Sequence, residues 1–350
     1  GTYFSATASP CRRCPPGAVC AGGGTPPQAA PGYYPVASGV YVSCAPADVC
    51  VGEGTCLRGH TGFRCGTCAS GFYKDADSGH CKDCPRNIVA VFVVLFTCAA
   101  IGCVVLVRIA RSAHGYFTAA SIGFNFLQVI SVLASFPRLR LPGSLKQLFR
   151  VLSAVNIDLQ LFRPECMVSD SKAAYHIIWA IKVSTPAIML IIFVAAWGCV
   201  WSWAKCRGTM PAEKLQSWKY AFTNASVTMM FILYLMVSNT ALEIFPCTRL
   251  PDGQYVMDRE PSVVCYSSTW FRQLAASLAV LICYSLAMPL VVGTVLFRRR
   301  ENLWKRKNQA KYGLLFARYR PAFFLFELAI LGRKFGVIFG KVLFAHSVVW

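Results

Sequence analysis

The distribution of apolar and polar residues divides the chain near residue 88. Before this point apolar residues are interspersed with Cys, Gly and Pro, whereas the twenty residues from Ile88 to Val107 contain neither a charge nor a proline. At about 1.5 Å per residue, a helix of that length crosses the roughly 30 Å hydrocarbon core of a bilayer. We therefore predict a cysteine-rich region over residues 1–87 and a polytopic helical membrane domain over residues 88–350.

Further apolar segments follow the first and are separated by polar, mostly basic loops. Residues 144–162 place apolar side chains on one helical face and charged ones largely opposite, which is typical of a helix lying in the membrane interface. The predicted class is a mainly α membrane protein with six transmembrane helices, one interfacial helix and a small disulfide-rich, loop-rich N-terminal ectodomain. The six spans are expected at about 88–107, 117–136, 175–203, 220–245, 271–297 and 321–350.

Charge sets the orientation of these spans. The chain is 55% hydrophobic with a net charge of +20, and its Lys and Arg residues lie mainly between apolar segments. Loops one, three and five carry fifteen of them against eight in the alternate loops, so the positive-inside rule places the odd loops in the cytoplasm and residues 1–87 outside. This pattern favours the lipid bilayer as partner and argues against nucleic acid.

Ten cysteines precede the membrane, in a region with too few large aliphatic residues for a core, so disulfides are expected to stabilise it. Five internal disulfides are possible. The spacing of the last four would also suit zinc, but six neighbouring cysteines and the adjoining membrane helix favour disulfides, and we expect no metal and no cofactor. The candidates are Cys11, Cys14, Cys20, Cys44, Cys50, Cys56, Cys65, Cys68, Cys81 and Cys84.

Three more cysteines flank the later predicted spans. Cys247 and Cys265 bracket a polar loop before the fifth span, and we expect a disulfide in this loop. Cys166 precedes the third span and is expected either to be the odd cysteine or to pair with one of those two.

Charged residues inside predicted spans are candidate functional residues, because a charge in hydrocarbon is costly. Lys182 and Glu243 lie near the outer ends of spans three and four, and we hypothesise that they pair, with snorkelling to the headgroups as the alternative. The sixth segment suggests either a structural pair between Glu327 and a nearby base or a functional ion path. Its charges are Glu327, Arg333, Lys334 and Lys341.

A polar stripe follows the second predicted span and should face other helices or water rather than lipid. Helix packing through hydrogen-bonding side chains is favoured over a conduction pathway. The stripe consists of Thr118, Ser121, Asn125, Gln128 and Ser135.

Catalytic motifs are not recognisable in the sequence, so we predict that the protein is not an enzyme. The five histidines are scattered without metal-ligand spacing, at His60, His80, His114, His176 and His346.

The N-terminal motif Cys11-x-x-Cys14-Pro15-Pro16-Gly17-x-x-Cys20, followed by Pro31-Gly32-Tyr33-Tyr34, resembles ephrin-receptor-like, growth-factor-receptor-type cysteine-rich repeats. Gly59-x-x-Gly62-x-x-Cys65 is similar to an EGF-type turn. The resemblance implies the ectodomain of a large cell-surface protein that meets protein partners through this region.

The membrane part resembles the transient-receptor-potential-like C-terminal regions of large algal and protist surface proteins. Its motifs are Phe126-Leu127-Gln128, Pro164-Glu165-Cys166, Phe245-Pro246-Cys247, Ser262-Val263-Val264-Cys265 and Glu327 to Arg333-Lys334. The resemblance implies a channel-like sensory subunit, or part of one, in the plasma or ciliary membrane. The alternatives are a seven-helix-type receptor with an extracellular ligand domain, and a passive anchor or adhesion module of a larger assembly. We expect a longer secreted-pathway protein, with a pore loop and lining helix after Trp350 if it is a channel.

Overall fold

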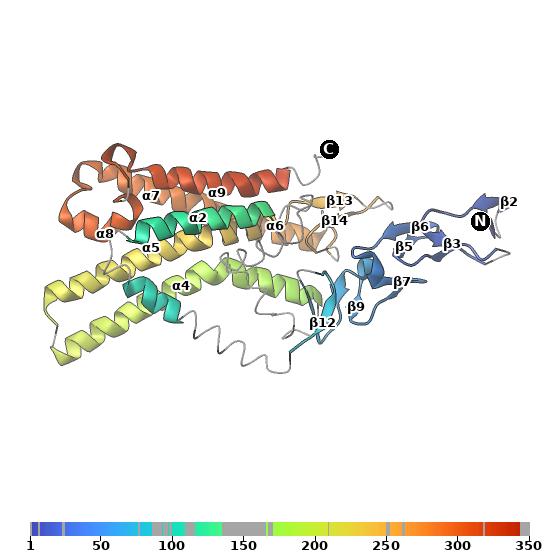
Figure 1. Ribbon diagram of the computed structural model, residues 1–350, viewed down its shortest axis with the longest axis horizontal. Coiled ribbons are helices and arrows are strands. Elements are labelled where there is room, and N and C mark those ends of the chain that lie inside the picture. The colour runs from blue at the N-terminus through green and yellow to red at the C-terminus, as the bar shows by residue number, and fades with distance from the viewer. Residues whose placement is uncertain are drawn as a thin grey trace. The chain divides into compact units, whose positions relative to one another are not determined.

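The fold divides into two compact units, each described by itself. The disulfide unit comprises Gly1–Val91, Leu159–Ile178 and Ile244–Gln273, and the helical unit comprises Phe92–Asp158, Trp179–Glu243 and Leu274–Trp350. The computed structural model describes residues 2–5, 8–22, 25–75, 78–85, 93, 97, 100–108, 116–134, 166, 171–208, 210–249, 253–260, 263–317 and 319–343 (Figure 1).

Short antiparallel strand pairs make up the disulfide unit. Seven two-stranded sheets join strands adjacent in sequence, and none continues into a larger sheet among the described residues. Two short 3-10 helices, η1 (Ala47–Val49) and η2 (Phe63–Cys65), lie between strands. The pairs are β1 (Thr2–Ser5) with β2 (Ala8–Arg13), β3 (Ala18–Val19) with β4 (Gln28–Ala29), β5 (Tyr33–Ala37) with β6 (Val40–Ser43), β7 (Cys50–Gly52) with β8 (Thr55–Cys56), β9 (His60–Thr61) with β10 (Thr67–Cys68), β11 (Phe72–Lys74) with β12 (Cys81–Asp83), and β13 (Cys247–Arg249) with β14 (Tyr255–Met257).

A structural repeat runs through the first 85 residues. The amide of Ala30 donates to the carbonyl of Gly17 at 3.0 Å, and Ala69 donates to Gly59 in the same way at 2.9 Å. Further along, Cys44 donates to Gly32 at 2.8 Å and Cys84 donates to Gly71 at 2.9 Å. Cys44 and Cys84 therefore occupy equivalent positions in two copies of one motif.

Glycine is required at the start of both copies. Gly17 has φ of +81° and Gly59 has φ of +83°, a region that side chains disfavour. A Cβ would lie 2.4 Å from the ring of Tyr33 in the first copy and 2.6 Å from the ring of Phe72 in the second. The aromatic ring thus packs directly on the glycine backbone.

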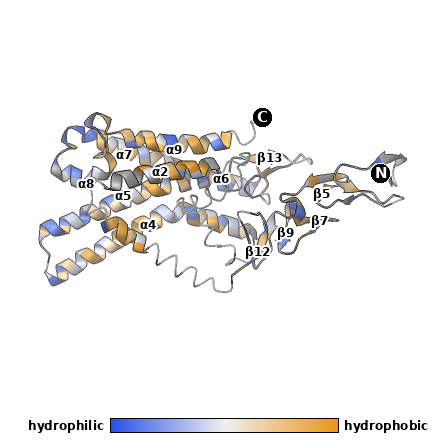
Figure 2. Cartoon of the chain, viewed as in Figure 1, coloured by the Kyte–Doolittle hydropathy of each residue, from blue (hydrophilic) through white to orange (hydrophobic). Residues whose placement is uncertain are grey.

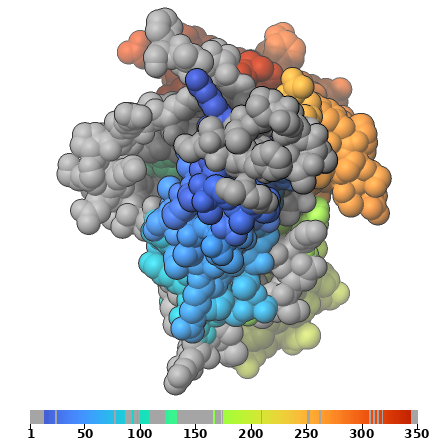
Figure 3. All heavy atoms as spheres, turned by 90° about the vertical axis from the view of Figure 1, so that its right-hand side faces the viewer, coloured from blue at the N-terminus to red at the C-terminus, as the bar shows by residue number. Residues whose placement is uncertain are grey.

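Sulfur takes the place of an aliphatic core in this unit. Its buried cluster consists of Cys44, Val49, Cys50 and Cys65, with Tyr34 and Cys56 packed against it. The described atoms of this cysteine-rich region are coloured blue to cyan in Figure 3.

Long helices make up the helical unit, and their apolar residues appear in orange in Figure 2. Residues 100–108 are helical. The helix that starts at Ser268 continues as a π-helical segment, η6 (Leu281–Leu286), into α7, and α4 and α6 both begin in the disulfide unit. The elements are α2 (Tyr116–Ala134), α4 (Ser171–Arg207), α5 (Ala212–Leu242), α6 (Ser268–Val280), α7 (Ala287–Arg298), η7 (Arg300–Asn302), α8 (Arg306–Phe316), η8 (Pro321–Phe323) and α9 (Phe326–Leu343).

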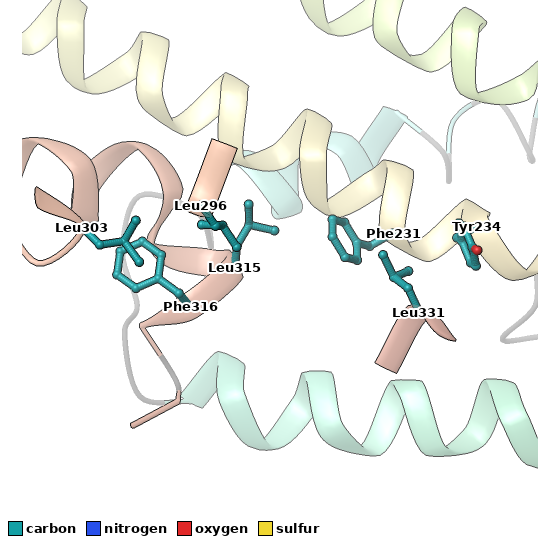
Figure 4. Packing of buried hydrophobic residues seen from close by; sticks show 7 residues of the cluster. All are labelled: Phe231, Tyr234, Leu296, Leu303, Leu315, Phe316 and Leu331. Atoms are coloured by element: carbon teal, nitrogen blue, oxygen red, sulfur yellow. The ribbon is translucent and has the colours of Figure 1, made fainter. Parts of the chain in front are cut away.

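Apolar packing joins these helices. The largest cluster comes from α5, α7, α8, α9 and the turn after α7, with Phe231, Tyr234, Leu296, Leu303, Leu315, Phe316 and Leu331 (Figure 4). A second cluster connects α2, α5 and α9 through Val132, Leu235, Leu242 and Ile338. A third joins helical residues 100–108 to α4 and α5 through Val107, Phe193, Ala221 and Ala225.

Three helices among the described residues are long and apolar enough to cross a membrane: Tyr175–Arg207, Ala212–Leu242 and Ser268–Arg298. The expectation of six spans is therefore not supported. Of α2 the described side chains cover only the apolar segment Ile122–Val132, and the 18-residue α9 carries four charges. Much of the predicted first span and the predicted interfacial helix at 144–162 lie outside the described residues.

Candidate functional site

A buried polar seam crosses the helical unit. Lys334 of α9 is 1% exposed, and its Nζ donates to Oε1 of Gln128 at 2.8 Å. Gln128 of α2, also 1% exposed, donates through Nε2 to the carbonyl of Ile232 in α5 at 2.9 Å. Three helices are thereby joined through one amide, and the ammonium group has an acceptor where desolvation would otherwise be costly.

Further hydrogen bonds extend this seam from α5 to the π-helical segment η6. Pro289 has no amide hydrogen, so it cannot donate to the carbonyl of Ser285 four residues earlier. The hydroxyl of Tyr234 donates to that carbonyl at 3.0 Å, and the hydroxyls of Ser238 and Ser285 lie 2.8 Å apart. Tyr284 donates to the carbonyl of Met230 at 2.7 Å. Side chains of both α5 and η6 therefore hold this irregular helix, and π-helical segments are frequent at functional sites.

The other charges of α9 differ in their surroundings. Glu327 is 3% exposed, and its Oε2 accepts a hydrogen bond from the Tyr319 hydroxyl at 2.7 Å. Arg333 is exposed and Lys341 is half-buried. The predicted face of Glu327, Lys334 and Lys341 is thus buried to different degrees, and the hydrogen bond of Lys334 described above goes to Gln128. An ion pair between Glu327 and a base of its own helix stays a prediction.

Lys182 lies in the first third of α4, and Glu243 directly follows the last residue of α5. Lys182 is 8% exposed, in the turn before Pro186. Glu243 ends α5, and its Oε1 accepts a hydrogen bond from Nδ2 of Asn239 at 3.1 Å. Their proposed ion pair stays a prediction.

Disulfides connect most of the predicted cysteines. The side chain of Cys11 lies outside the described part of the chain. The cysteines with zinc-like spacing belong to three different disulfides, so their sulfurs are not available as thiolate ligands. The bonds are Cys14–Cys20, Cys44–Cys50, Cys56–Cys65, Cys68–Cys81, Cys84–Cys166 and Cys247–Cys265.

Cys166 corrects one expectation. Its partner is Cys84, neither Cys247 nor Cys265, and the first 87 residues therefore do not form a closed set of five disulfides. The repeat explains why. Cys44 finds a partner six residues later, at Cys50, but the chain after the equivalent Cys84 enters the predicted membrane helix. The partner must then come from another segment.

His60 has a structural role that the sequence does not indicate. It is 8% exposed, its Nε2 accepts a hydrogen bond from the Cys81 amide at 3.0 Å, and its Nδ1 lies 2.9 Å from the carbonyl of Cys65. Both contacts are satisfied by a neutral ring with the proton on Nδ1. His60 thus ties the Cys68–Cys81 and Cys56–Cys65 disulfides together through their backbones.

Comparison with known proteins gives a distant similarity. The chain is 22% identical, over an alignment of 443 residues, to Cysteine repeat modular protein A of Toxoplasma gondii. The alignment covers 97% of this chain and 14% of the relative. No family model and no solved structure matches the chain. Together with the disulfides and the three membrane-length helices, this similarity supports a cysteine-rich, surface-type membrane protein.

Proposed function

We propose that the chain is a channel-like sensory region, of the transient-receptor-potential-like type, within a large cysteine-rich surface protein of the plasma or ciliary membrane. The observation that carries the proposal is the buried polar seam of Lys334, Gln128, Tyr234 and Ser285, set among membrane-length helices. Buried ionisable and hydroxyl groups in membrane helices commonly belong to ion pathways or to the elements that gate them. Because two of these hydrogen bonds end on backbone carbonyls, small helix shifts would break them.

The disulfide unit supplies a route by which an external signal reaches this seam. Cys84–Cys166 cross-links two of its three chain segments, and Cys247–Cys265 closes a loop within the third. The second and third segments contain the first turns of α4 and α6. A force or ligand that displaces the cysteine-rich region would act on both helices at once. The helix that begins as α6 carries Ser285, the acceptor of Tyr234.

Disulfide connectivity also bears on topology. A disulfide joins cysteines on the same side of a membrane, so Cys84 and Cys166 require an even number of crossings between them. A helical pair formed by the helix that contains residues 100–108 and by α2 satisfies this condition, and α4 with α5 satisfies it between Cys166 and Cys247. We therefore include in the proposal an arrangement of six spans with residues 1–87 outside, which is compatible with this connectivity.

The receptor alternative loses one of its supports. In that plan the cysteine before the third span would pair with the loop before the fifth, whereas Cys166 pairs with Cys84. A passive anchor would need a stable bundle but no buried cation. In a channel-like protein the seam would take part in gating, whereas in either alternative it would serve helix packing alone.

Electrophysiology tests the proposal. We expect cells expressing the full-length protein to show a current in response to stretch of the membrane, and external reductant to abolish it by opening Cys84–Cys166. Lys334→Met should shift the activation threshold, and Arg333→Met, at the exposed neighbouring position, should leave it unchanged. Absence of current in the wild type, with the protein shown at the surface, would refute the channel-like role and favour an anchor.

A further inference from the structure

A basic and aromatic surface lies where α7 ends. Residues 298–307 contain six Lys or Arg residues and a single acid, Glu301. Arg298, Arg299, Arg300 and Lys305 are all exposed. We call the segment from Phe297 to Lys305 the basic collar. The collar makes up most of residues 298–307, the densest cluster of positive charge in the sequence.

Aromatic rings hold the guanidinium groups of the basic collar in place. Cζ of Arg300 lies 4.8 Å from the ring centroid of Phe297, and Cζ of Arg299 lies 5.6 Å from that of Tyr312 in α8. Trp304 packs edge-on against Phe316, with ring centroids 5.3 Å apart. Such cation–π contacts restrain long side chains while leaving their outer N–H groups free for a ligand.

The backbone beneath this surface is fixed by the main hydrophobic cluster. Leu296 is 0% exposed and Leu303 is 1% exposed, and both belong to the cluster shown in Figure 4. Phe297 and Trp304 each follow one of these leucines directly, and they are 54% and 41% exposed. The basic collar thus presents charge and exposed aromatic rings together on a rigid base.

Helix length places the basic collar at a defined depth. The 31 residues of Ser268–Arg298 would span about 46 Å, against about 40–45 Å for a bilayer with its headgroups. If one end lies at one headgroup layer, Arg298 lies at the other. Exposed Phe and Trp rings at that depth are typical of the membrane interface.

The same construction recurs at the end of α4. Nζ of Lys205 lies 5.2 Å from the ring of Trp201, and Cζ of Arg207 lies 5.2 Å from that of Trp203. Both tryptophans are exposed. Two helices therefore end in basic side chains that lie over aromatic rings. This arrangement is compatible with the membrane interface, which has acyl chains on one side and anionic headgroups on the other.

We propose that the basic collar binds the phosphate headgroups of anionic lipids in the cytoplasmic leaflet. Arginine N–H groups match phosphate oxygens in bidentate geometry, and Phe297 and Trp304 would enter the acyl boundary beside the same lipid. An acidic soluble partner would match the charges but would leave both rings in water. The inference rests on the membrane crossing of the α6–α7 helix contained in the proposed function, and it is independent of conduction.

Thermal unfolding of the purified full chain in nanodiscs tests this site. One set contains phosphatidylcholine alone, and the other contains phosphatidylcholine with phosphatidylserine. Wild-type chain should gain about 5 °C in Tm from phosphatidylserine, the shift expected for a ligand near 100 times its Kd. Arg298→Gln/Arg299→Gln/Arg300→Gln should lose this gain. The matched control Arg249→Gln/Arg259→Gln/Arg272→Gln, which removes three exposed arginines of the disulfide unit, should keep it.

Further arms separate the sources of negative charge. Inorganic phosphate and poly-glutamate, added to phosphatidylcholine nanodiscs, should each raise Tm by less than 1 °C; an equal gain from either would overturn the lipid assignment. If the glutamine variant folds poorly, Arg298→Lys/Arg299→Lys/Arg300→Lys replaces it in the test. This variant keeps the charge and should retain part of the gain in Tm. A full gain in a folded glutamine variant would refute the site. Extraction of the chain from membranes by carbonate would instead contradict the membrane crossing itself.

Discussion

The two units of this chain are stabilised by different kinds of interaction. In the disulfide unit the buried cluster is three cysteines and one valine, and the strands are two to six residues long. In the helical unit the largest cluster draws seven residues from helices far apart in sequence, and buried hydrogen bonds add to it. One unit therefore depends on its oxidation state, and the other on packing and on satisfying buried polar groups.

The largest expected effect comes from the bond that crosses chain segments. Cys84–Cys166 closes 82 residues, and chain entropy gives such a closure up to about 4.5 kcal/mol, against about 2 kcal/mol for the six residues of Cys14–Cys20. Cys84→Ser/Cys166→Ser should therefore raise hydrogen exchange across the disulfide unit far more than Cys14→Ser/Cys20→Ser, with α5 unaffected. Equal effects of the two double variants would show that the long cross-link is not what organises this unit.

In the helical unit the corresponding test is Gln128→Leu, which removes the hydrogen bond between Lys334 and Gln128. It leaves the buried Lys334 ammonium without the amide acceptor, a change expected to cost about 3 kcal/mol or more. Adding Lys334→Met removes the charge and should restore most of the loss, because an apolar pair of similar volume needs no partner. Thermal unfolding in detergent micelles measures both variants, with Arg333→Met as an exposed control within about 0.5 kcal/mol of wild type. Additive losses in the double variant would argue against the contact.

His60 tests whether the disulfide unit also depends on a buried hydrogen-bond bridge. His60→Ala leaves the Cys81 amide and the Cys65 carbonyl without this partner and should cost about 1–3 kcal/mol. His80→Ala, which removes a partly exposed ring next to Asp48, should cost less than about 1 kcal/mol. Resistance of residues 56–81 to limited proteolysis compares the two. A larger effect at His80 would reverse the assignment.

The smallest effect is electrostatic and depends on pH. Hydrogen bonds from Lys82, at 2.7 Å, and from Ser78 lower the pKa of Asp75 below its ordinary value. A lowered folded pKa stabilises the fold above the unfolded pKa of about 3.9, and this contribution is lost as pH falls through the folded pKa. Because Lys82 is half exposed, Lys82→Gln should cost only a few tenths of a kcal/mol at pH 7 and nothing below about pH 2. Hydrogen exchange in β11 and β12 at both pH values checks this, and a loss that grows on acidification would contradict it.

The features that depend on composition and local pattern could be predicted from the sequence. Cysteine density predicted disulfides, apolar runs predicted the three membrane-length helices, and the polar stripe of the second predicted span contained Gln128. The start of α5 at Ala212 was placed eight residues late, because the polar turns before Tyr220 are helical without being apolar.

Long-range pairings were beyond the sequence. No local sequence pattern indicates that Cys84 pairs with Cys166. Helical periodicity likewise cannot show that Lys334 contacts an amide side chain on α2. The bridging role of His60 depends on two backbone groups that have no sequence signature. Only the fold shows that Cys84 takes the place of Cys44 in a repeated motif.

The central proposal is that residues 1–87 lie outside the cell and that the basic collar lies at the cytoplasmic face of the membrane. Epitope tags inserted after the exposed residues Ser38 and Glu301 of the full-length protein test it by antibody staining of intact and permeabilised cells. We expect staining of the Ser38 tag on intact cells, and staining of the Glu301 tag only after permeabilisation. Staining of both tags on intact cells, or of neither, would contradict it.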